Sequence, residues 1–121
     1  MTVFACHACG TPLTGPLTES EVDSSPTVTD GLQPLMARGT FTTNDDEDDG
    51  PIGAIILNPD DIQGVRRHSD RRRLNGCCDL DGLDGPNLVC ATCGAEVATL
   101  QNDCWVSWTL VRLESAAVTT V

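Results

Sequence analysis

Cys6-His-Ala-Cys-Gly10 and Cys90-Ala-Thr-Cys-Gly94 stand about 80 residues apart and share one pattern, two cysteines separated by two residues and followed by glycine. Two intervening residues let a tight turn point both sulfurs at one ion, and glycine allows the backbone conformation that closes the turn. Two such turns supply four thiolates, the ligand set of a tetrahedral structural zinc site. The sequence therefore predicts one Zn²⁺ bound by Cys6, Cys9, Cys90 and Cys93.

Other uses of these four cysteines stay open at this stage. A disulfide framework needs an oxidising compartment, and residues 1–10 show neither the basic start nor the long apolar stretch of an export signal. A redox pair of the thioredoxin type stands at a helix start after a βαβ pattern, which neither turn shows. Iron also accepts four thiolates, so the spacing does not separate iron from zinc.

Composition limits what the chain can be. Its 121 residues correspond to a single domain, residues 1–121, and only two Phe, two Trp and no Tyr are available for the core. The longest apolar run, residues 54–57, is too short to cross a membrane. Without an export signal, the chain is predicted to be cytoplasmic and to make no membrane contact. A core so poor in aromatic residues is expected to depend on the metal for its stability.

Charge is strongly unbalanced, with 18 Asp and Glu against seven Arg, no Lys, and a net charge of −11. Such an acidic chain is a poor nucleic-acid binder, because binding to phosphates requires cations. Residues 66–73 nevertheless hold five of the seven arginines. These either pair with the acids of residues 45–49 or 79–84, or they form a contact surface for an acidic protein or a phosphate-bearing ligand. We call them the basic strip: Arg66, Arg67, Arg71, Arg72 and Arg73.

Apolar alternation and turn residues predict a mostly β chain, with small antiparallel sheets clamped by the Cys₄ zinc site. Strands are expected within residues 3–14 on both sides of the first turn, and at residues 35–43, 52–57, 88–90, 95–101 and 104–113. The last of these alternates most regularly and places Val106, Trp108 and Leu110 on one face.

The remaining segments are expected to be irregular, with at most one short helix. Asn58-Pro-Asp-Asp61 has the cap, the proline and the acids of a helix start, and Gly64 is expected to end that helix. Loops are predicted at residues 16–34, where a weak edge strand is the alternative, at 44–51 and at 74–87, and residues 114–121 are predicted to be a tail.

Three cysteines lie outside the two turns. Cys104, at a strand start, fits a buried small hydrophobic residue. Cys77 and Cys78 are adjacent, so their side chains are expected to diverge, and only one of them would readily join a common site. With Cys104 and His68, that one could hold a second metal ion.

Asp79-Leu-Asp-Gly-Leu-Asp-Gly85 places three carboxylates in a glycine-rich loop, as a calcium site would. The match to an EF-hand loop is poor, because the third Asp comes one position late and no Glu closes the site. A structural turn, in which Asp side chains accept backbone amides, is the favoured interpretation. His7, inside the first turn, is predicted to point to solvent.

The four cysteines and the β-rich spacer between them resemble the layout of the β-tent group, which includes Yippee-like, Mis18-like and cereblon thalidomide-binding domains. That resemblance implies two Cys-x-x-Cys knuckles that clamp two antiparallel sheets at one end, and an elaborated zinc ribbon is the other layout. Cereblon-type domains hold a cyclic imide in a cage of several Trp or Tyr, for which this chain offers only Trp105 and Trp108.

Two further resemblances add little about activity. Residues 75–87, 90–99 and 103–105 resemble a group of small uncharacterised proteins from high-GC actinobacteria, and this match implies no known activity. Methionine sulfoxide reductases of type B share the double knuckle. They require a reactive Cys within an Arg-Tyr-Cys-type strand, which this sequence lacks.

The sequence therefore favours a zinc-stabilised binding or adaptor module that acts through contacts with a protein partner. No acid–base pair, nucleophile triad or phosphate loop is recognisable, and four Cys ligands leave no place for a catalytic water, so no enzyme is expected. The alternatives are a small-molecule binder or enzyme of the β-tent type with a groove near Trp105 and Trp108, nucleic-acid contact through the basic strip, and a structural component of a phage or other assembly.

Overall fold

The computed structural model describes residues 1–21, 33–47, 50–104 and 108–121, and these residues form a mostly β protein, as the sequence predicts. Short 3₁₀ helices, η2 (Pro59–Asp61) and η3 (Arg71–Arg73), interrupt the strands. The strands are β1 (Phe4–Cys6), β2 (Thr18–Glu19), β3 (Gln33–Pro34), β4 (Thr40–Thr43), β5 (Ile55–Leu57), β6 (Val65–Arg67), β7 (Leu88–Cys90), β8 (Glu96–Gln101), β9 (Trp108–Leu113) and β10 (Val118–Thr120).

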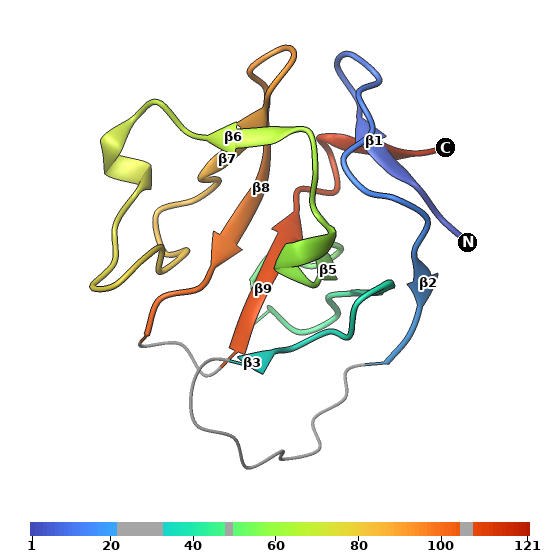
Figure 1. Cartoon of the computed structure of the whole chain (residues 1–121), viewed down its shortest axis with the longest axis horizontal. Coiled ribbons are helices and arrows are strands. Elements are labelled where there is room, and N and C mark those ends of the chain that lie inside the picture. The colour runs from blue at the N-terminus through green and yellow to red at the C-terminus, as the bar shows by residue number, and fades with distance from the viewer. Residues whose placement is uncertain (22–32, 48–49, 105–107) are drawn as a thin grey trace.

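The large sheet has the strand order β2-β4-β5-β9-β8-β7-β6, and β3 pairs with β9 beside this path. Its neighbours are antiparallel except for the short parallel pairs β2–β4 and β3–β9. β5, which lies within the strand predicted at residues 52–57, is flanked by β4 and β9 and so occupies the middle of the sheet. A second sheet pairs β1 with β10 (Figure 1).

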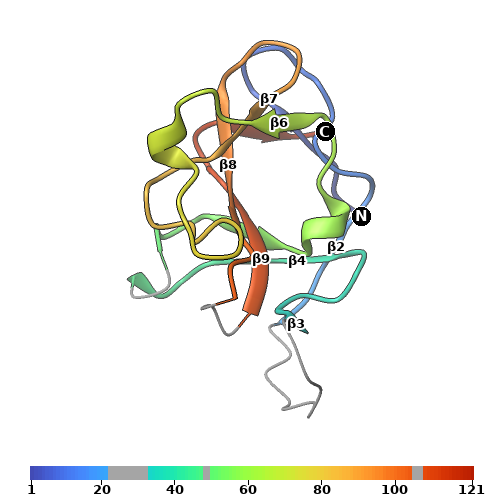
Figure 2. The same ribbon diagram turned by 60° about the vertical axis from the view of Figure 1, so that its left-hand side comes forward.

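The main core lies between the large sheet and the N-terminal segment, and the rings of Phe4 and Phe41 meet edge to face in it, 5.0 Å apart. In Figure 2 the strands β6 to β9 and β4 surround this core, and the N-terminal residues close the remaining side. A smaller cluster of Met36, Ile56 and Leu110 lies apart from it. Burial on both sides explains why β5 has no polar residue.

Several element boundaries differ from the prediction for local reasons. The strand expected at residues 35–43 begins only at Thr40, because Arg38 and Gly39 form a turn whose backbone and guanidinium groups donate to Asp61. The helix at Asn58 is confirmed as a 3₁₀ turn, with the Asn58 side chain accepting from the Asp60 amide at 2.9 Å, but it ends by Ile62 and not at Gly64. A second 3₁₀ turn, η3, was not predicted.

The strand predicted at residues 104–113 begins at Trp108 in the described part of the chain. Cys104 lies in a turn, and Val106 and Trp105 fall outside the described residues. Leu110 is buried as expected, but Val111 is buried as well, because both faces of β9 are covered.

The prediction of a tail at residues 114–121 is wrong. Residues 118–120 form β10, which pairs with β1 in the register Phe4 to Thr120 and Cys6 to Val118. The segment is too short and too poor in large side chains to be recognised as a strand alone, and its partner lies at the other end of the sequence. The described loop residues 16–21 and 33–34 include only the short strands β2 and β3, consistent with a loop or weak edge strand.

Deleting residues 118–121 tests the contribution of β10. The deletion removes the only strand that pairs with β1 among the described residues and withdraws Val118 from the core, so we expect a loss of about 2 kcal/mol or more in the free energy of unfolding. Denaturant unfolding measures this loss. Thr119→Ser, at an exposed position that keeps the strand pairing, is the control. Equal stability of the deletion variant and the full chain would contradict a structural role for β10.

Candidate metal centre

The two Cys-x-x-Cys-Gly turns adopt the same backbone geometry. In the first, the Gly10 amide donates to the Cys6 carbonyl at 2.8 Å, and in the second the Gly94 amide donates to the Cys90 carbonyl at 2.8 Å. Both glycines have φ of 79°, a left-handed conformation that side chains rarely adopt. The equal spacing of the two motifs therefore produces two equal knuckles, as predicted.

The knuckles lie side by side at one end of the molecule, as both views show (Figures 1 and 2). Their four sulfurs lie within 4.8 Å of one another. The Sγ atoms of Cys6 and Cys93 are 3.6 Å apart, and those of Cys9 and Cys90 are also 3.6 Å apart. A tetrahedral site with Zn–S bonds of about 2.3 Å requires sulfurs about 3.8 Å apart, whereas a disulfide requires about 2.05 Å. The quartet therefore fits a metal ion and not a pair of disulfides.

The strands position the first cysteine of each knuckle. Cys6 ends β1 and Cys90 ends β7, and both side chains are fully buried in the main core. The second cysteine of each knuckle is exposed at the tip of its turn. Two backbone bonds of 2.9 Å and 2.8 Å tie the knuckles to neighbouring segments, from the His7 amide to Ala117 and from the Ala91 amide to Gly64.

The thiols of the quartet differ in acidity. Burial disfavours the thiolate of Cys90, but backbone amides of its own turn and the Cys9 thiol favour it more, and its pKa falls to about 6. The Thr11 hydroxyl, 3.1 Å from the Cys9 sulfur, lowers the pKa of Cys9. For Cys93 the Ala95 amide favours the thiolate, yet burial and the other three sulfurs oppose it, and the pKa rises to about 11. A cluster of this kind needs a cation to ionise completely.

A cation of the protein lies next to the second knuckle. A side chain at Gly94 would come within 3.5 Å of the Arg66 guanidinium, so Arg66 covers this turn. Four thiolates around a divalent ion carry a net charge of −2, and a guanidinium at this place compensates part of it.

The basic strip is only partly neutralised within the chain. Arg67 pairs with Asp79 at 3.0 Å, as one prediction had it, whereas Arg72 pairs with Asp70 at 3.0 Å and Arg73 with Glu96 at 2.8 Å. Among the described residues, no ion pair joins an arginine of the strip to an acid of residues 45–47. Within the described residues, Arg66 and Arg71 form no ion pair.

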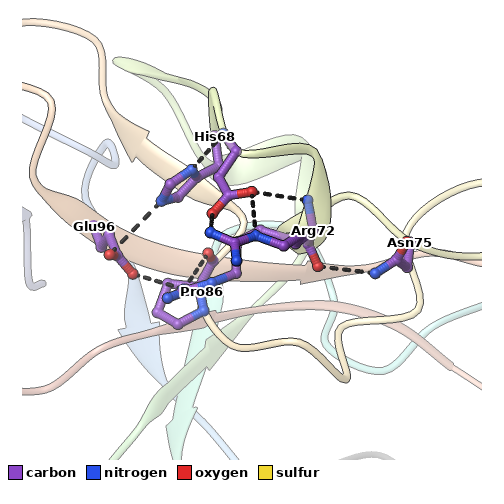
Figure 3. A network of polar contacts seen from close by, with 7 residues as sticks. His68, Arg72, Asn75, Pro86 and Glu96 are labelled. Carbon is purple, nitrogen blue, oxygen red and sulfur yellow. Dashed lines mark hydrogen bonds and ion pairs between the residues drawn. The ribbon is translucent and has the colours of Figure 1, made fainter.

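A network of hydrogen bonds and ion pairs, which the sequence did not predict, surrounds the part of the strip near Arg72 (Figure 3). Glu96 accepts from Arg73 and lies 3.7 Å from His68, whose other ring nitrogen accepts from the Asp70 amide at 2.9 Å. Arg73 also donates to the Pro86 carbonyl at 3.1 Å. The side chain of His68 is only 16% exposed. His7 is exposed, as predicted.

The three remaining cysteines differ from the prediction. Cys104 is exposed and forms a disulfide with Cys78, so it is not a buried free thiol. Cys77 is a free, exposed thiol, and the sulfurs of all three lie within 4.8 Å of one another. Adjacent side chains were expected to diverge, but the irregular loop turns Cys77 and Cys78 to the same place. His68 is not part of this cluster.

A buried carboxylate that the sequence analysis missed lies under these cysteines. Asp103, 2% exposed, accepts backbone amides from Cys77 and Cys78 at 2.9 and 2.7 Å, and further amides from Asp79 and Cys104. These amides hold the pKa of the Asp103 carboxyl below its ordinary value, so it stays ionised. No sequence pattern signals this contact, because three of the four donors lie 24 to 26 positions away.

The acidic loop after Cys78 is a structural turn. The Asp81 carboxylate accepts the Leu83 amide at 2.9 Å, as the favoured interpretation predicts. Asp79 binds Arg67 and Asn102, and Asp84 accepts from Asn75. Each carboxylate thus faces its own partner, and these residues do not gather around a common point.

One hollow has no cysteine in its lining. It has a volume of about 260 Å³, and its rim includes Leu83, which is 84% exposed. Trp108, near which a groove was expected, does not line it, and Trp105 lies outside the described residues. The wall is formed by Gly50, Pro51, Gly82, Gly85, Thr99, Gln101, Arg112 and Glu114.

Comparison of the chain with protein-family models, with curated proteins and with solved structures finds no match. The β-tent layout and the actinobacterial likeness therefore stay predictions. Among the described residues, no helix has the length and apolar character needed to span a membrane.

Thr11→Ala tests the contact between hydroxyl and sulfur in the first knuckle. The second knuckle has Ala95 at the equivalent position, so the substitution makes the two turns alike. Loss of a hydrogen bond to a metal ligand is expected to weaken metal retention about 10-fold. Competition with a chelator measures this change. Thr18→Ala, an exposed threonine on β2, should change nothing, and equal retention in all three chains would contradict the assigned role.

Proposed function

We propose that this protein is a small binding module whose fold is held by one structural Zn²⁺ at the four-cysteine centre, and that it acts through contacts with another protein. The observation that carries the proposal is the crosswise approach of the two knuckles, with 3.6 Å between the paired sulfurs. Four thiolates fill all positions of a tetrahedral zinc ion and leave none for a substrate or a catalytic water. The ion is therefore proposed to stabilise the fold, and the chain to bind and not to catalyse.

Zinc is favoured over the other uses of four cysteines on chemical grounds. The sulfur spacing matches a tetrahedral ion, and thiolates are preferred ligands of zinc. A cytoplasmic location, which the sequence predicts, would keep the quartet reduced, and a disulfide such as Cys78–Cys104 would form there only transiently. Iron would use the same ligands, and elemental analysis distinguishes the two metals.

The metal assignment predicts one zinc ion for each chain that carries the Cys78–Cys104 disulfide. Binding of structural zinc contributes on the order of 10 kcal/mol or more in small peptides, as much as the whole stability of an ordinary domain. Cys9→Ser or Cys93→Ser should therefore unfold the chain or make it insoluble. Cys77→Ser, a matched change at an exposed thiol outside the quartet, should leave it folded.

Elemental analysis of the purified protein, together with circular dichroism of the three variants, checks this prediction. A folded chain that holds no metal at the quartet would contradict it. Iron in place of zinc would retain the structural role and correct the metal.

The proposed contact surface is the basic strip. The chain as a whole is acidic, yet two arginines of this strip have no acidic partner among the described residues. Arg66 and Arg71 are exposed, and in the described part of the chain neither forms an ion pair. The planar guanidinium fork binds a carboxylate through two parallel hydrogen bonds. An acidic protein surface is therefore the proposed partner. Long nucleic acids are disfavoured, because the net charge of −11 repels them.

Combined replacement of Arg66 and Arg71 by Ala tests this surface. We expect loss of the proteins that co-purify with a tagged chain from its native cells. The double variant should also melt at a somewhat lower temperature, because Arg66 covers the second knuckle, whereas Arg71→Ala alone should weaken partner binding without that fall. Arg73→Ala should instead lower the melting temperature, because Arg73 bridges Glu96 and the Pro86 carbonyl.

Arg38→Ala is the control for loss of an exposed arginine outside the strip, since Arg38 pairs with Asp61. Mass spectrometry after nuclease treatment reports the retained proteins. Retention of every partner by the double variant, or equal loss in Arg38→Ala, would remove the basic strip from the proposed function. Loss of the partners on nuclease treatment would point to nucleic acid.

A further inference from the structure

Cys77, Cys78 and Cys104 form a second group of sulfurs, separate from the four-cysteine centre. Cys78 and Cys104 are joined as a disulfide, and Cys77 is free and exposed beside them. All three ligand atoms lie within 4.8 Å of one another. Three thiolates on a tetrahedral zinc ion stand about 3.8 Å apart, so a shift of about 1 Å at Cys77 and opening of the disulfide would give a metal-binding arrangement.

The backbone around these sulfurs is fixed by contacts that do not involve the disulfide. The buried Asp103 carboxylate accepts amides from both arms of the cluster, from Cys77 and Cys78 on one side and from Cys104 on the other. Asn102 adds two bonds, donating to the Asp79 carboxylate at 2.9 Å and accepting the Leu80 amide at 3.1 Å. Because these bonds hold main-chain groups, the cysteines are expected to stay together after the disulfide is reduced.

Close packing adds to this rigidity. A Cβ at Gly76 would overlap the Asp79 carbonyl oxygen, so only glycine allows the chain to turn back here. Leu80, 2% exposed, anchors the following residues, and its carbonyl accepts the Asn102 and Asp103 amides. A thiolate site formed on such a loop would lose little conformational entropy on binding an ion, because its ligands are already held in place.

We propose that Cys77, Cys78 and Cys104 are a second, redox-controlled zinc site, which holds Zn²⁺ when the three thiols are reduced and loses it when the Cys78–Cys104 disulfide forms. Soft thiolate ligands suit Zn²⁺, and three protein ligands leave the fourth position to water. Unlike the four-cysteine centre, all three of these residues are exposed, so the ion can be exchanged with solvent. This site goes beyond the proposed structural zinc and does not depend on it.

The chemistry requires a small thiol and its disulfide as redox partners. Two molecules of thiol reduce the Cys78–Cys104 bond, giving two protein thiols and one molecule of the small disulfide. Zn²⁺ then binds the three cysteines and releases three protons. In the reverse direction the small disulfide accepts two electrons from the thiolates of Cys78 and Cys104, takes up two protons from water and becomes two thiols. The ion leaves because Cys77 alone does not retain it, and the Cys77 sulfur takes up the third proton.

The test counts zinc in the full chain in two redox states. One sample is reduced with a small thiol under nitrogen, the other is oxidised with glutathione disulfide, and both are titrated with Zn²⁺ against a chromogenic chelator while free thiols are counted. We expect two zinc ions per chain in the reduced form and one in the oxidised form. Adding glutathione disulfide to the reduced, loaded chain should release one zinc ion for every two thiols lost.

Cys77→Ser and Cys104→Ser separate metal binding from disulfide formation. Cys77→Ser keeps the disulfide-forming pair, so it should still lose two thiols on oxidation but bind only one zinc ion in either state. Cys104→Ser should bind one zinc ion and form no disulfide. Circular dichroism checks that both variants remain folded.

The outcomes distinguish this site from the structural one. One zinc ion in both redox states of the unaltered chain, or two in reduced Cys77→Ser, would overturn the second site and leave the four-cysteine centre intact. One zinc ion in the reduced form and none in the oxidised form would support the second site and overturn the structural zinc.

Discussion

Four sulfur atoms from two turns, 81 positions apart for Cys9 and Cys90, meet at one end of the molecule, and this contact joins the two ends of the chain to the core. Cys6 and Cys90 are members of the same buried cluster as Phe4, Leu88 and Val97, so the metal centre and the hydrophobic core are continuous. Linking two such distant positions removes chain entropy from the unfolded state worth about 4 to 5 kcal/mol for a covalent bond at 25 °C. In a chain with few aromatic residues, an ion bound by the four cysteines, as proposed, would add stability beyond that of the core.

Local patterns in the sequence predict the parts of the structure that depend on local geometry. The knuckles are predicted by the cysteine spacing and the two glycines, and the apolar run within residues 52–57 predicts the strand β5. Contacts between distant segments leave no local pattern in the sequence, so they were not predicted. β10 pairs with β1 across the whole sequence, and Asp103 meets amides about 25 positions away, so neither leaves a periodic or spaced signal.

Cys104 shows how a neighbouring pattern misleads. Its place at the start of an alternating segment indicated a buried strand residue, but the described strand begins only at Trp108 and the turn before it exposes the sulfur. The basic strip shows a related limit. Its total charge is evident from the sequence, whereas the distribution of its partners depends on which carboxylates the fold brings near, and Glu96 reaches Arg73 from a different strand.

The disulfide closes a loop from Cys78 to Cys104, and the four-cysteine centre brings Cys9 next to Cys90 and so closes a second loop. The segment between Cys78 and Cys90 belongs to both loops. Each end of this segment is thus fixed by a different kind of bond. Local opening of a loop normally needs only the rupture of a few hydrogen bonds, and irregular chain exchanges its amide hydrogens quickly. Here an opening that frees the whole segment must break the disulfide or, with the proposed ion bound, release one of its ligands. Amide hydrogens between these two cysteines are therefore expected to exchange slowly for a stretch with so little regular structure, and reduction should accelerate exchange first at the Cys78 end.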